Sequence, residues 1–167
     1  MSGEGFLHPL AEVFVVPSSI SVVKGADGLE HLNRTLTADV SGLRLQGRQD
    51  ALLCNANGRI LDHLILCNLG EQVILVGNHG TGDETRQKLL QGVAWDEEVT
   101  VMNGDGAIGH LRLLGKAVDR CLVGLGIDPS EIDSQSWTEF GSALISRTNV
   151  GDSAITEILV PSVELES

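Results

Sequence analysis

Two ionisable side chains, Asp62 and His63, stand side by side in an otherwise apolar segment, residues 60–66, which reads ILDHLIL. If this segment is a strand, successive side chains point to opposite faces, so Asp62 points to one face and His63 and Ile65 to the other. Burying an ionisable group without a partner costs about 2 kcal/mol or more. The two side chains therefore belong either to polar networks of the core or to a ligand pocket, and the sequence leaves both interpretations open.

Asn78 is a second candidate for ligand binding, because it ends an apolar run and precedes a glycine-rich loop at 79–82. Its carboxamide offers a donor and an acceptor side by side, which suits the edge of a heterocycle. Asparagine is also a common turn residue, so a purely structural role is the alternative.

A glycine motif, Gly104-x-Gly106-x-x-Gly109, matches the dinucleotide-binding fingerprint. In that fingerprint the third glycine opens a helix whose N-terminus faces a pyrophosphate. The residues that follow here, HLRLL, alternate like a strand and end at another glycine. We therefore predict a glycine-rich hairpin turn in place of a nucleotide site.

The histidines and cysteines show no spacing typical of a metal site or a redox pair. The histidines are His8, His31, His63, His79 and His110. The cysteines are Cys54, Cys67 and Cys121. We predict no metal ligands and interpret the cysteines as buried free thiols.

The composition fits one globular domain and excludes several partners. The chain has 167 residues, 42% of them hydrophobic, and no tyrosine, so no ring can stack on tyrosine. Its 11 basic and 23 acidic residues give a net charge of −12, which repels nucleic acid and anionic membranes. The first 20 residues do not resemble a signal peptide, and no apolar run is long enough to span a bilayer, so we expect a cytoplasmic protein.

The elements that must position these residues centre on a hairpin. Asn57-Gly58 between two apolar runs predicts a type I′ turn and a central strand covered on both faces. The other expected strands are 13–23, interrupted at Pro17, and 72–76, 98–102, 108–114, 137–140, 143–147 and 155–160. Helices are expected at 26–36, at 83–91 and after Gly115.

The second half of the chain repeats the order of the first, since strand, glycine and helix at 20–36 recur at 108–122. This predicts an α+β fold with a mostly antiparallel sheet, in which two β-α-β-β-like halves share the sheet. We divide the chain into an N-terminal arm at 1–12, a domain at 13–161 and an acidic tail at 162–167.

The ordered segments resemble the folate-binding domain shared by the glycine cleavage T-protein and YgfZ-like proteins. The matching segments are Gly25-Ala26-Asp27, Leu36–Val40, Asn55–Asp62, Val73–Asn78, Leu111–Gly115 and Thr156–Pro161. The resemblance implies tetrahydrofolate as the ligand, in a cleft beside the central hairpin. Carried over by position, it assigns ligand contacts to Asn78 and Ile65, with Asp62 and His63 at the family's pair of acidic residues.

Two departures from this family bear on the activity. T-proteins have two consecutive acidic residues after the hairpin, and His63 stands at the second, which we take as the catalytic carboxylate. The stretch Lys-Gly-Cys-x-x-Gly-Gln-Glu that marks YgfZ-like chains does not occur in these residues. A protein partner or a second copy of the chain is therefore expected to complete the cleft.

Three functions remain open. The resemblance favours a YgfZ-like tetrahydrofolate-binding protein of iron–sulfur cluster assembly or one-carbon metabolism, without turnover of its own. The alternatives are a degenerate domain that works as an interaction or homo-oligomerisation module, and a fragment of an aminomethyltransferase.

Overall fold

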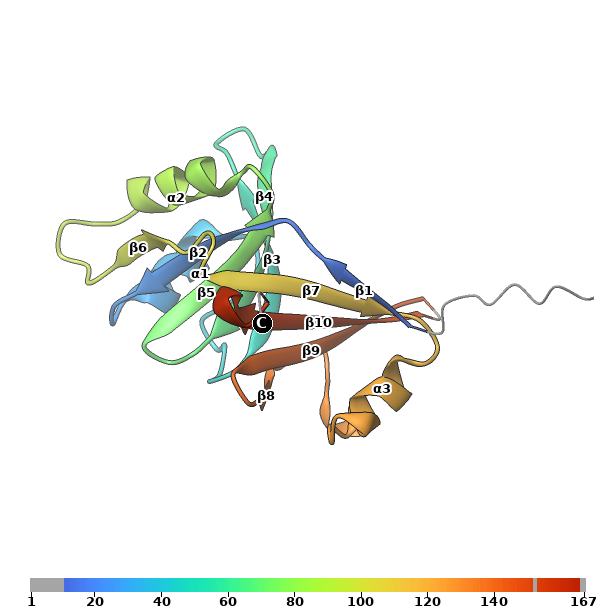
Figure 1. Cartoon of the computed structure of the whole chain (residues 1–167). Coiled ribbons are helices and arrows are strands. Elements are labelled where there is room, and N and C mark those ends of the chain that lie inside the picture. The colour runs from blue at the N-terminus through green and yellow to red at the C-terminus, as the bar shows by residue number, and fades with distance from the viewer. Residues whose placement is uncertain (1–10, 152, 166–167) are drawn as a thin grey trace, which may run out of the picture.

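The computed structural model describes residues 11–151 and 153–165 and has an α+β fold built on two five-stranded sheets (Figure 1). The first, called the β4 sheet, contains β3 (Arg48–Cys54), β4 (Ile60–Asn68), β5 (Gln72–Asn78), β2 (Ser18–Lys24) and β6 (Thr100–Asn103), in that order. The second, called the β7 sheet, contains β1 (Glu12–Val15), β7 (Ile108–Leu114), β10 (Ser153–Pro161), β9 (Ala143–Val150) and β8 (Thr138–Phe140). The strands of both sheets pair antiparallel throughout.

Three helices cover the outer faces of the sheets: α1 (Gly28–Thr35), α2 (Gly82–Gln91) and α3 (Val118–Gly124). Short 3₁₀ turns, η1 (Pro129–Glu131) and η2 (Ser162–Glu164), complete the fold. None of the helices in the described residues is long and apolar enough to cross a membrane. Most of the expected arm at 1–12 lies outside the described residues, although Glu12 begins β1, and the last two residues of the expected tail lie outside them as well.

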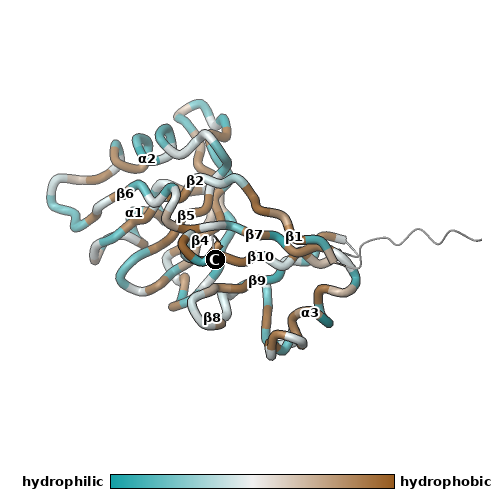
Figure 2. Tube along the Cα trace, viewed as in Figure 1, coloured by the Kyte–Doolittle hydropathy of each residue, from teal (hydrophilic) through white to brown (hydrophobic). Residues whose placement is uncertain are grey.

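Three apolar clusters hold the layers together. Leu32 of α1 and Leu89 of α2 pack with Leu75 on one face of the β4 sheet. The other face of that sheet packs against the β7 sheet through Ile65 and Trp137. A third cluster joins the far face of the β7 sheet to α3. Hydrophilic and hydrophobic residues both occur along α2, as expected of a helix with one face buried (Figure 2).

The predicted hairpin is confirmed, but the predicted type I′ turn is wrong. The loop has five residues, 55–59, and of Asn57 and Gly58 only the glycine takes a positive φ, 74°. The Asn55 side chain accepts hydrogen bonds from the backbone N–H groups of Asn57 (2.9 Å) and Arg59 (3.0 Å). Because this side chain stabilises the longer loop, a single left-handed residue is enough to close it.

The predicted alternation along β4 holds beyond a β-bulge. Leu53 pairs with Asp62 and Cys54 with Ile60, which leaves Leu61 as the extra residue. Leu61 was expected on the face of His63, but it packs in the cluster beneath the helices. After the bulge, Leu64 points to that helical side and Ile65 to the β7 sheet, as predicted.

The two halves each begin with the strand, glycine and helix that the sequence predicts. Gly25 after β2 has φ 115° and Gly115 after β7 has φ 121°, a conformation that favours glycine. A Cβ atom at Gly25 would lie 1.8 Å from the carbonyl oxygen of Glu98. The expectation of one shared sheet is wrong, however, because β7 pairs with β1 and β10 and so builds a sheet of its own.

The motif at Gly104, Gly106 and Gly109 joins β6 to β7 and is followed by no helix before α3, so it is not a dinucleotide fingerprint. Gly106 takes φ 77°, and the N–H of Ala107 donates to the Gly104 carbonyl at 3.1 Å. The predicted hairpin is also wrong, because β6 pairs with β2 and β7 with β1 and β10. The turn instead carries the chain from one sheet to the other.

The three cysteines are free thiols, as predicted, but only Cys67 is fully buried. Cys54 is half-buried, and Cys121 on α3 is exposed, contrary to the expectation. Burial, with a smaller contribution from the charge of Glu139, raises the pKa of the Cys67 thiol to about 12.

We expect a thiol-reactive dye at pH 8 to modify Cys121 quickly in the folded protein and Cys67 only upon unfolding. The reason is that the reactive species is the thiolate, which Cys67 scarcely forms below its raised pKa. Mass spectrometry of timed samples locates each label, and Cys121→Ser should abolish the fast phase. Rapid labelling of Cys67 in native conditions would contradict the buried position.

Candidate functional site

A small cavity lies between the two sheets, and it brings together three of the four residues singled out in the sequence. We call it the inter-sheet cavity; its volume is about 70 Å³. It is lined in part by His63, Ile65, Val76, Asn78, His110 and Arg112. These residues come from β4, β5 and β7, so two neighbouring strands of the β4 sheet form one wall and β7 forms the opposite one.

The fourth residue, Asp62, lies on the other face of β4 and does not line this cavity. It is 1% exposed, and one carboxylate oxygen accepts hydrogen bonds from the Asn78 backbone N–H (3.0 Å) and Nδ2 (2.9 Å). The other accepts from the hydroxyl groups of Thr81 (2.8 Å) and Thr85 (2.7 Å). A Cβ atom at Gly77 would lie 2.4 Å from this carboxylate, so the close approach depends on glycine. Asp62 therefore positions Asn78 at the end of β5.

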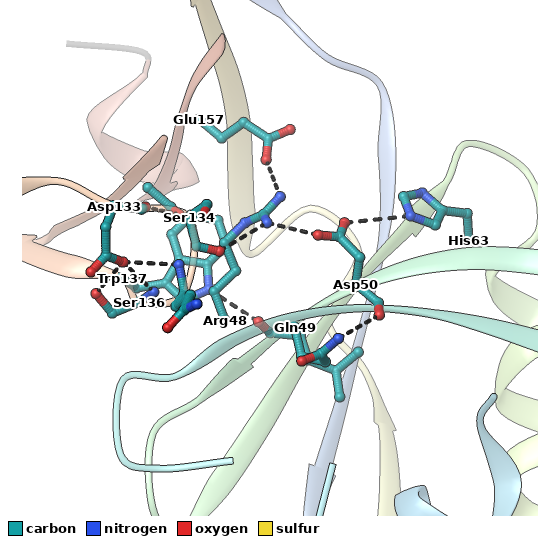
Figure 3. A network of polar contacts seen from close by, with 12 residues as sticks. Arg48, Gln49, Asp50, His63, Asp133, Ser134, Ser136, Trp137 and Glu157 are labelled. Atoms are coloured by element: carbon teal, nitrogen blue, oxygen red, sulfur yellow. Dashed lines mark hydrogen bonds and ion pairs between the residues drawn. The ribbon is translucent and has the colours of Figure 1, made fainter. Parts of the chain in front are cut away.

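His63 lies at the exposed end of a chain of polar contacts that leads through Asp50 and Arg48 to Glu157 (Figure 3). Its side chain is 49% exposed, with Nε2 3.4 Å from Oδ1 of Asp50. The same Asp50 carboxylate pairs with Arg48 at 2.7 Å, and Arg48 pairs with Glu157 at 2.9 Å. Figure 3 shows Asp50 between His63 and Arg48, with Glu157 beyond the guanidinium.

Glu157 is the charged group at the inner end of this chain, and it ties the two sheets together. Its carboxylate also accepts a hydrogen bond from Nε of Arg112 at 2.9 Å and lies 3.5 Å from Nε2 of His110. Nδ1 of His110 in turn pairs with the hydroxyl of Ser18 on β2 at 2.9 Å. Contacts from β3 and β7 thus converge on one carboxylate of β10, and β2 holds His110 beside it.

The pKa of Glu157 reflects two opposing effects. Burial raises it, because the side chain is 3% exposed, but hydrogen bonds from His110, Arg112 and Arg48 outweigh burial and lower it from 4.5 to about 2. The ionised carboxylate is therefore strongly stabilised in the folded protein.

The sequence analysis did not identify Arg48, His110, Arg112 or Glu157 as members of a site. A signal was available for the last three, since each interrupts an apolar strand much as Asp62 does. Arg48 begins β3 but stands before the apolar residues at 51–54, so no such signal marked it.

Larger hollows lie elsewhere on the surface and contain none of the predicted site residues. One of about 560 Å³ is bordered by Arg44 and Gln135, and another of about 610 Å³ follows α2 and β6. Within residues 11–151 and 153–165, no three His, Cys, Asp or Glu side chains gather in a way that could hold a metal ion.

We expect Glu157→Gln to lower the free energy of unfolding by about 3 kcal/mol at pH 7, because a lowered carboxylate pKa stabilises the fold wherever the group is ionised. The pKa is lower in the folded state than in the unfolded one, so this contribution is present above pH 4.5 and is lost as the pH falls towards 2. Urea unfolding at several pH values should show the gap between variant and native protein closing over that range.

The matched control is Glu71→Gln, which removes an exposed carboxylate of the turn between β4 and β5. It should change stability little at any pH. A gap for Glu157→Gln that stays constant from pH 7 to pH 2 would contradict the role assigned to this carboxylate.

In sequence, the chain is similar to aminomethyltransferases. No family model matches the chain. Aminomethyltransferases from Listeria welshimeri and Bacillus cereus are 29% identical over 121 residues and 33% identical over 101 residues, which cover 72% and 60% of this chain. The matches cover 32% and 27% of those relatives, so the chain spans about a third or less of their length.

Two solved structures share the fold over 93% of this chain. The glycine cleavage system aminomethyltransferase T from Bartonella henselae aligns with a TM-score of 0.79 at 24% identity, over 43% of its own chain. A heterotetrameric sarcosine oxidase from Corynebacterium sp. U-96 aligns with a TM-score of 0.63 at 15% identity, over 78% of the matched chain. The predicted α+β class and the likeness to the T-protein fold are confirmed.

Proposed function

We propose that this chain is a tetrahydrofolate-binding domain of one-carbon metabolism that holds its ligand without turning it over. The observation that carries the proposal is the inter-sheet cavity, where His63, Ile65 and Asn78 meet. The resemblance to the T-protein and YgfZ-like family assigns ligand contacts to these positions. The curated relatives, which are named aminomethyltransferases, support the same chemistry.

The absence of turnover is inferred from His63. T-proteins carry an acidic residue at the corresponding position, whereas this chain presents a half-exposed imidazole paired with Asp50. An imidazole does not become an anion near neutral pH, so it does not replace a permanent carboxylate. Iron–sulfur cluster assembly is the other setting that the YgfZ-like resemblance implies.

The size of the cavity indicates that the rest of the cleft comes from another surface. A volume of about 70 Å³ holds roughly two water molecules, whereas sites for drug-sized ligands measure roughly 300–1,000 Å³. A folate would therefore lie mostly across the mouth of the cavity. We propose that a protein partner or a second copy covers it, and the similar fold within a heterotetrameric enzyme is compatible with such an assembly.

Isothermal titration with tetrahydrofolate tests the proposal, with His63→Ala as the site variant. Loss of this imidazole should weaken binding about tenfold, because one hydrogen bond to a charged or polar ligand group disappears. His63 is a better choice than Asn78, whose amide also satisfies the buried carboxylate of Asp62.

The control variant is His79→Ala, since His79 is exposed, follows Asn78 directly and does not line the cavity. It should bind tetrahydrofolate as the native protein does. If the native protein does not bind tetrahydrofolate, the proposed ligand is wrong. If the native protein and both variants bind it with equal affinity, the binding site does not include His63.

An interaction module is the second candidate, and the edge strand β1 favours it. Its Val13, Phe14 and Val15 are 64%, 44% and 68% exposed at the border of the β7 sheet, where β7 is its neighbour. An exposed apolar edge strand can pair with a strand of another chain. The third candidate, a portion of an aminomethyltransferase, is consistent with the partial coverage of the relatives.

If β1 pairs with β1 of a second copy, sedimentation velocity should show a dimer that Val13→Lys converts to a monomer. Lysine on an edge strand opposes strand pairing because its charge would be trapped in the new contact. Val163→Lys is the control, since Val163 is 78% exposed and lies in η2, away from β1 in the sequence. A native chain that sediments as a monomer at all concentrations would exclude this candidate.

A further inference from the structure

We propose that β6, together with the hollow beside it, is a docking site for an extended basic segment of another protein, which adds to the β4 sheet as a further strand. This site shares no lining residue with the inter-sheet cavity and does not depend on a folate. It is also distinct from the edge formed by β1, which borders the β7 sheet.

The first argument is the open edge of β6, which is the last strand of the β4 sheet and pairs with β2 alone (Figure 1). The N–H of Gly104 donates to the carbonyl of Ile20 at 2.9 Å, one step beyond the paired residues of the two strands. Hydrogen-bonded positions alternate along an antiparallel pair, so the backbone groups of Met102 face β2 and those of Val101 and Asn103 point away from it. In the part of the chain that the structure describes, no strand pairs with these outward groups.

The second argument is that β6 lacks the residues that usually block strand addition. Natural sheets protect exposed edges with devices such as lysine, proline or a β-bulge. The strand reads TVMN, without lysine or proline, and its register with β2 from Thr100 to Asn103 has no bulge. The opposite edge strand of the same sheet, β3, carries the charged Arg48 and Asp50 and pairs through a bulge. Of the two edges of the β4 sheet, β6 is therefore the one suited to accept another strand.

The third argument is the hollow beside this edge. Its volume is about 610 Å³, within the range of roughly 300–1,000 Å³ that is usual for ligand sites. Val101 and Asn103 line one side of it, and α2 lines the other side with Leu90, which is 52% exposed. Alternate side chains of a strand point to the same face, so an added strand would direct every second side chain towards Leu90 and Val101. Apolar side chains at those positions of the partner would lose contact with water there.

The fourth argument is charge, which identifies the partner as basic. Asp96 and Glu98 precede β6 and Asp105 follows it, and all three are exposed. Asp83 of α2 lines the hollow, and its side chain is 98% exposed. The cation that lines the hollow, Arg86, already pairs with Asp83 and Asp105. The excess of negative charge at both ends of the strand favours a partner segment with lysine or arginine at its own ends.

The same charges disfavour a second copy of this chain at the edge. Two antiparallel β6 strands would place Asp96 and Glu98 of one copy near Asp105 of the other, and like charges repel. Lys24 of β2 lies opposite Thr100 and offsets only one of these charges. The whole chain carries a net charge of −12, so two copies repel each other at long range as well.

Fluorescence anisotropy with labelled synthetic peptides tests the proposal. The probe has lysines at both ends and alternating valine and threonine between them. One control peptide has glutamate in place of each lysine, and a second has proline in place of the central threonine, because proline cannot complete a strand ladder. We expect the lysine peptide to bind and both control peptides to bind about tenfold more weakly or less.

The site variant is Leu90→Lys, which removes an apolar contact of the hollow and adds a positive charge beside the basic segment. It should weaken binding of the lysine peptide about tenfold or more. Val123→Lys is the matched control, because Val123 is also an exposed apolar residue of a helix but lies in α3, which covers the β7 sheet. This control should bind the peptide as the native protein does, and thermal unfolding verifies that both variants are folded.

Hydrogen exchange measured by NMR distinguishes strand addition from attraction between charges alone. In the native protein without peptide, the outward amides of Val101 and Asn103 should exchange faster than the amide of Met102, which faces β2. Saturation with the lysine peptide should slow the exchange of Val101 and Asn103 about tenfold or more, because a new strand ladder then covers them.

Slower exchange of the Val101 and Asn103 amides, together with weaker binding to Leu90→Lys, supports the proposal. Absence of binding, binding that leaves both amides unchanged, or equal affinity of the native protein and Leu90→Lys overturns it. Protection of the same amides that appears without peptide as the protein concentration rises assigns the edge to a second copy and overturns the basic partner. Tetrahydrofolate enters none of these measurements, so their outcome is independent of the proposed function.

Discussion

The carboxylate of Glu157 is the interaction on which the rest of this structure depends. It is buried where the two sheets meet and is held there by Arg48 of β3, Arg112 of β7 and the nearby His110. Removing one partner from a buried ion pair leaves an uncompensated charge, which costs more than the pair itself contributes. The network therefore fixes how the β4 sheet and the β7 sheet face each other, and with that the walls of the inter-sheet cavity.

This arrangement also explains why the cavity is polar although it lies beside an apolar core. Ile65 and Trp137 exclude water from most of the contact between the sheets. His63, His110 and Arg112 line the cavity, whereas the Glu157 carboxylate that pairs with Arg112 does not. Glu157 in this way holds Arg112 without occupying the space in front of it.

Much of the fold could be predicted from local patterns. The order of strand, glycine and helix at Gly25 and Gly115 follows from the apolar periodicity and from two positions whose positive φ favours glycine. Strand boundaries such as those of β7 agree with the alternation in the sequence. The turn type at Asn57-Gly58 and the bulge at Leu61 could not be predicted, because side-chain hydrogen bonds and cross-strand pairing decide them.

The candidate site was only partly predictable for a similar reason. His63, Ile65 and Asn78 stood out by position along the hairpin and its neighbour, and they line one cavity. Arg112 and Glu157 are 45 positions apart along the chain, and their contact exists only because β7 pairs with β10. Periodicity assigns a residue to a face of its own strand, but it does not determine which strand lies opposite.

The pairing of β1 with β7 has a consequence for folding during synthesis on the ribosome. Glu12 pairs with Leu114, so β1 leaves the ribosome roughly one hundred residues before its neighbour β7 is complete. Throughout that interval the Val-Phe-Val segment is available to other nascent chains and to chaperones. The order of synthesis thus leaves β1 without its neighbour until after every strand of the β4 sheet has been made.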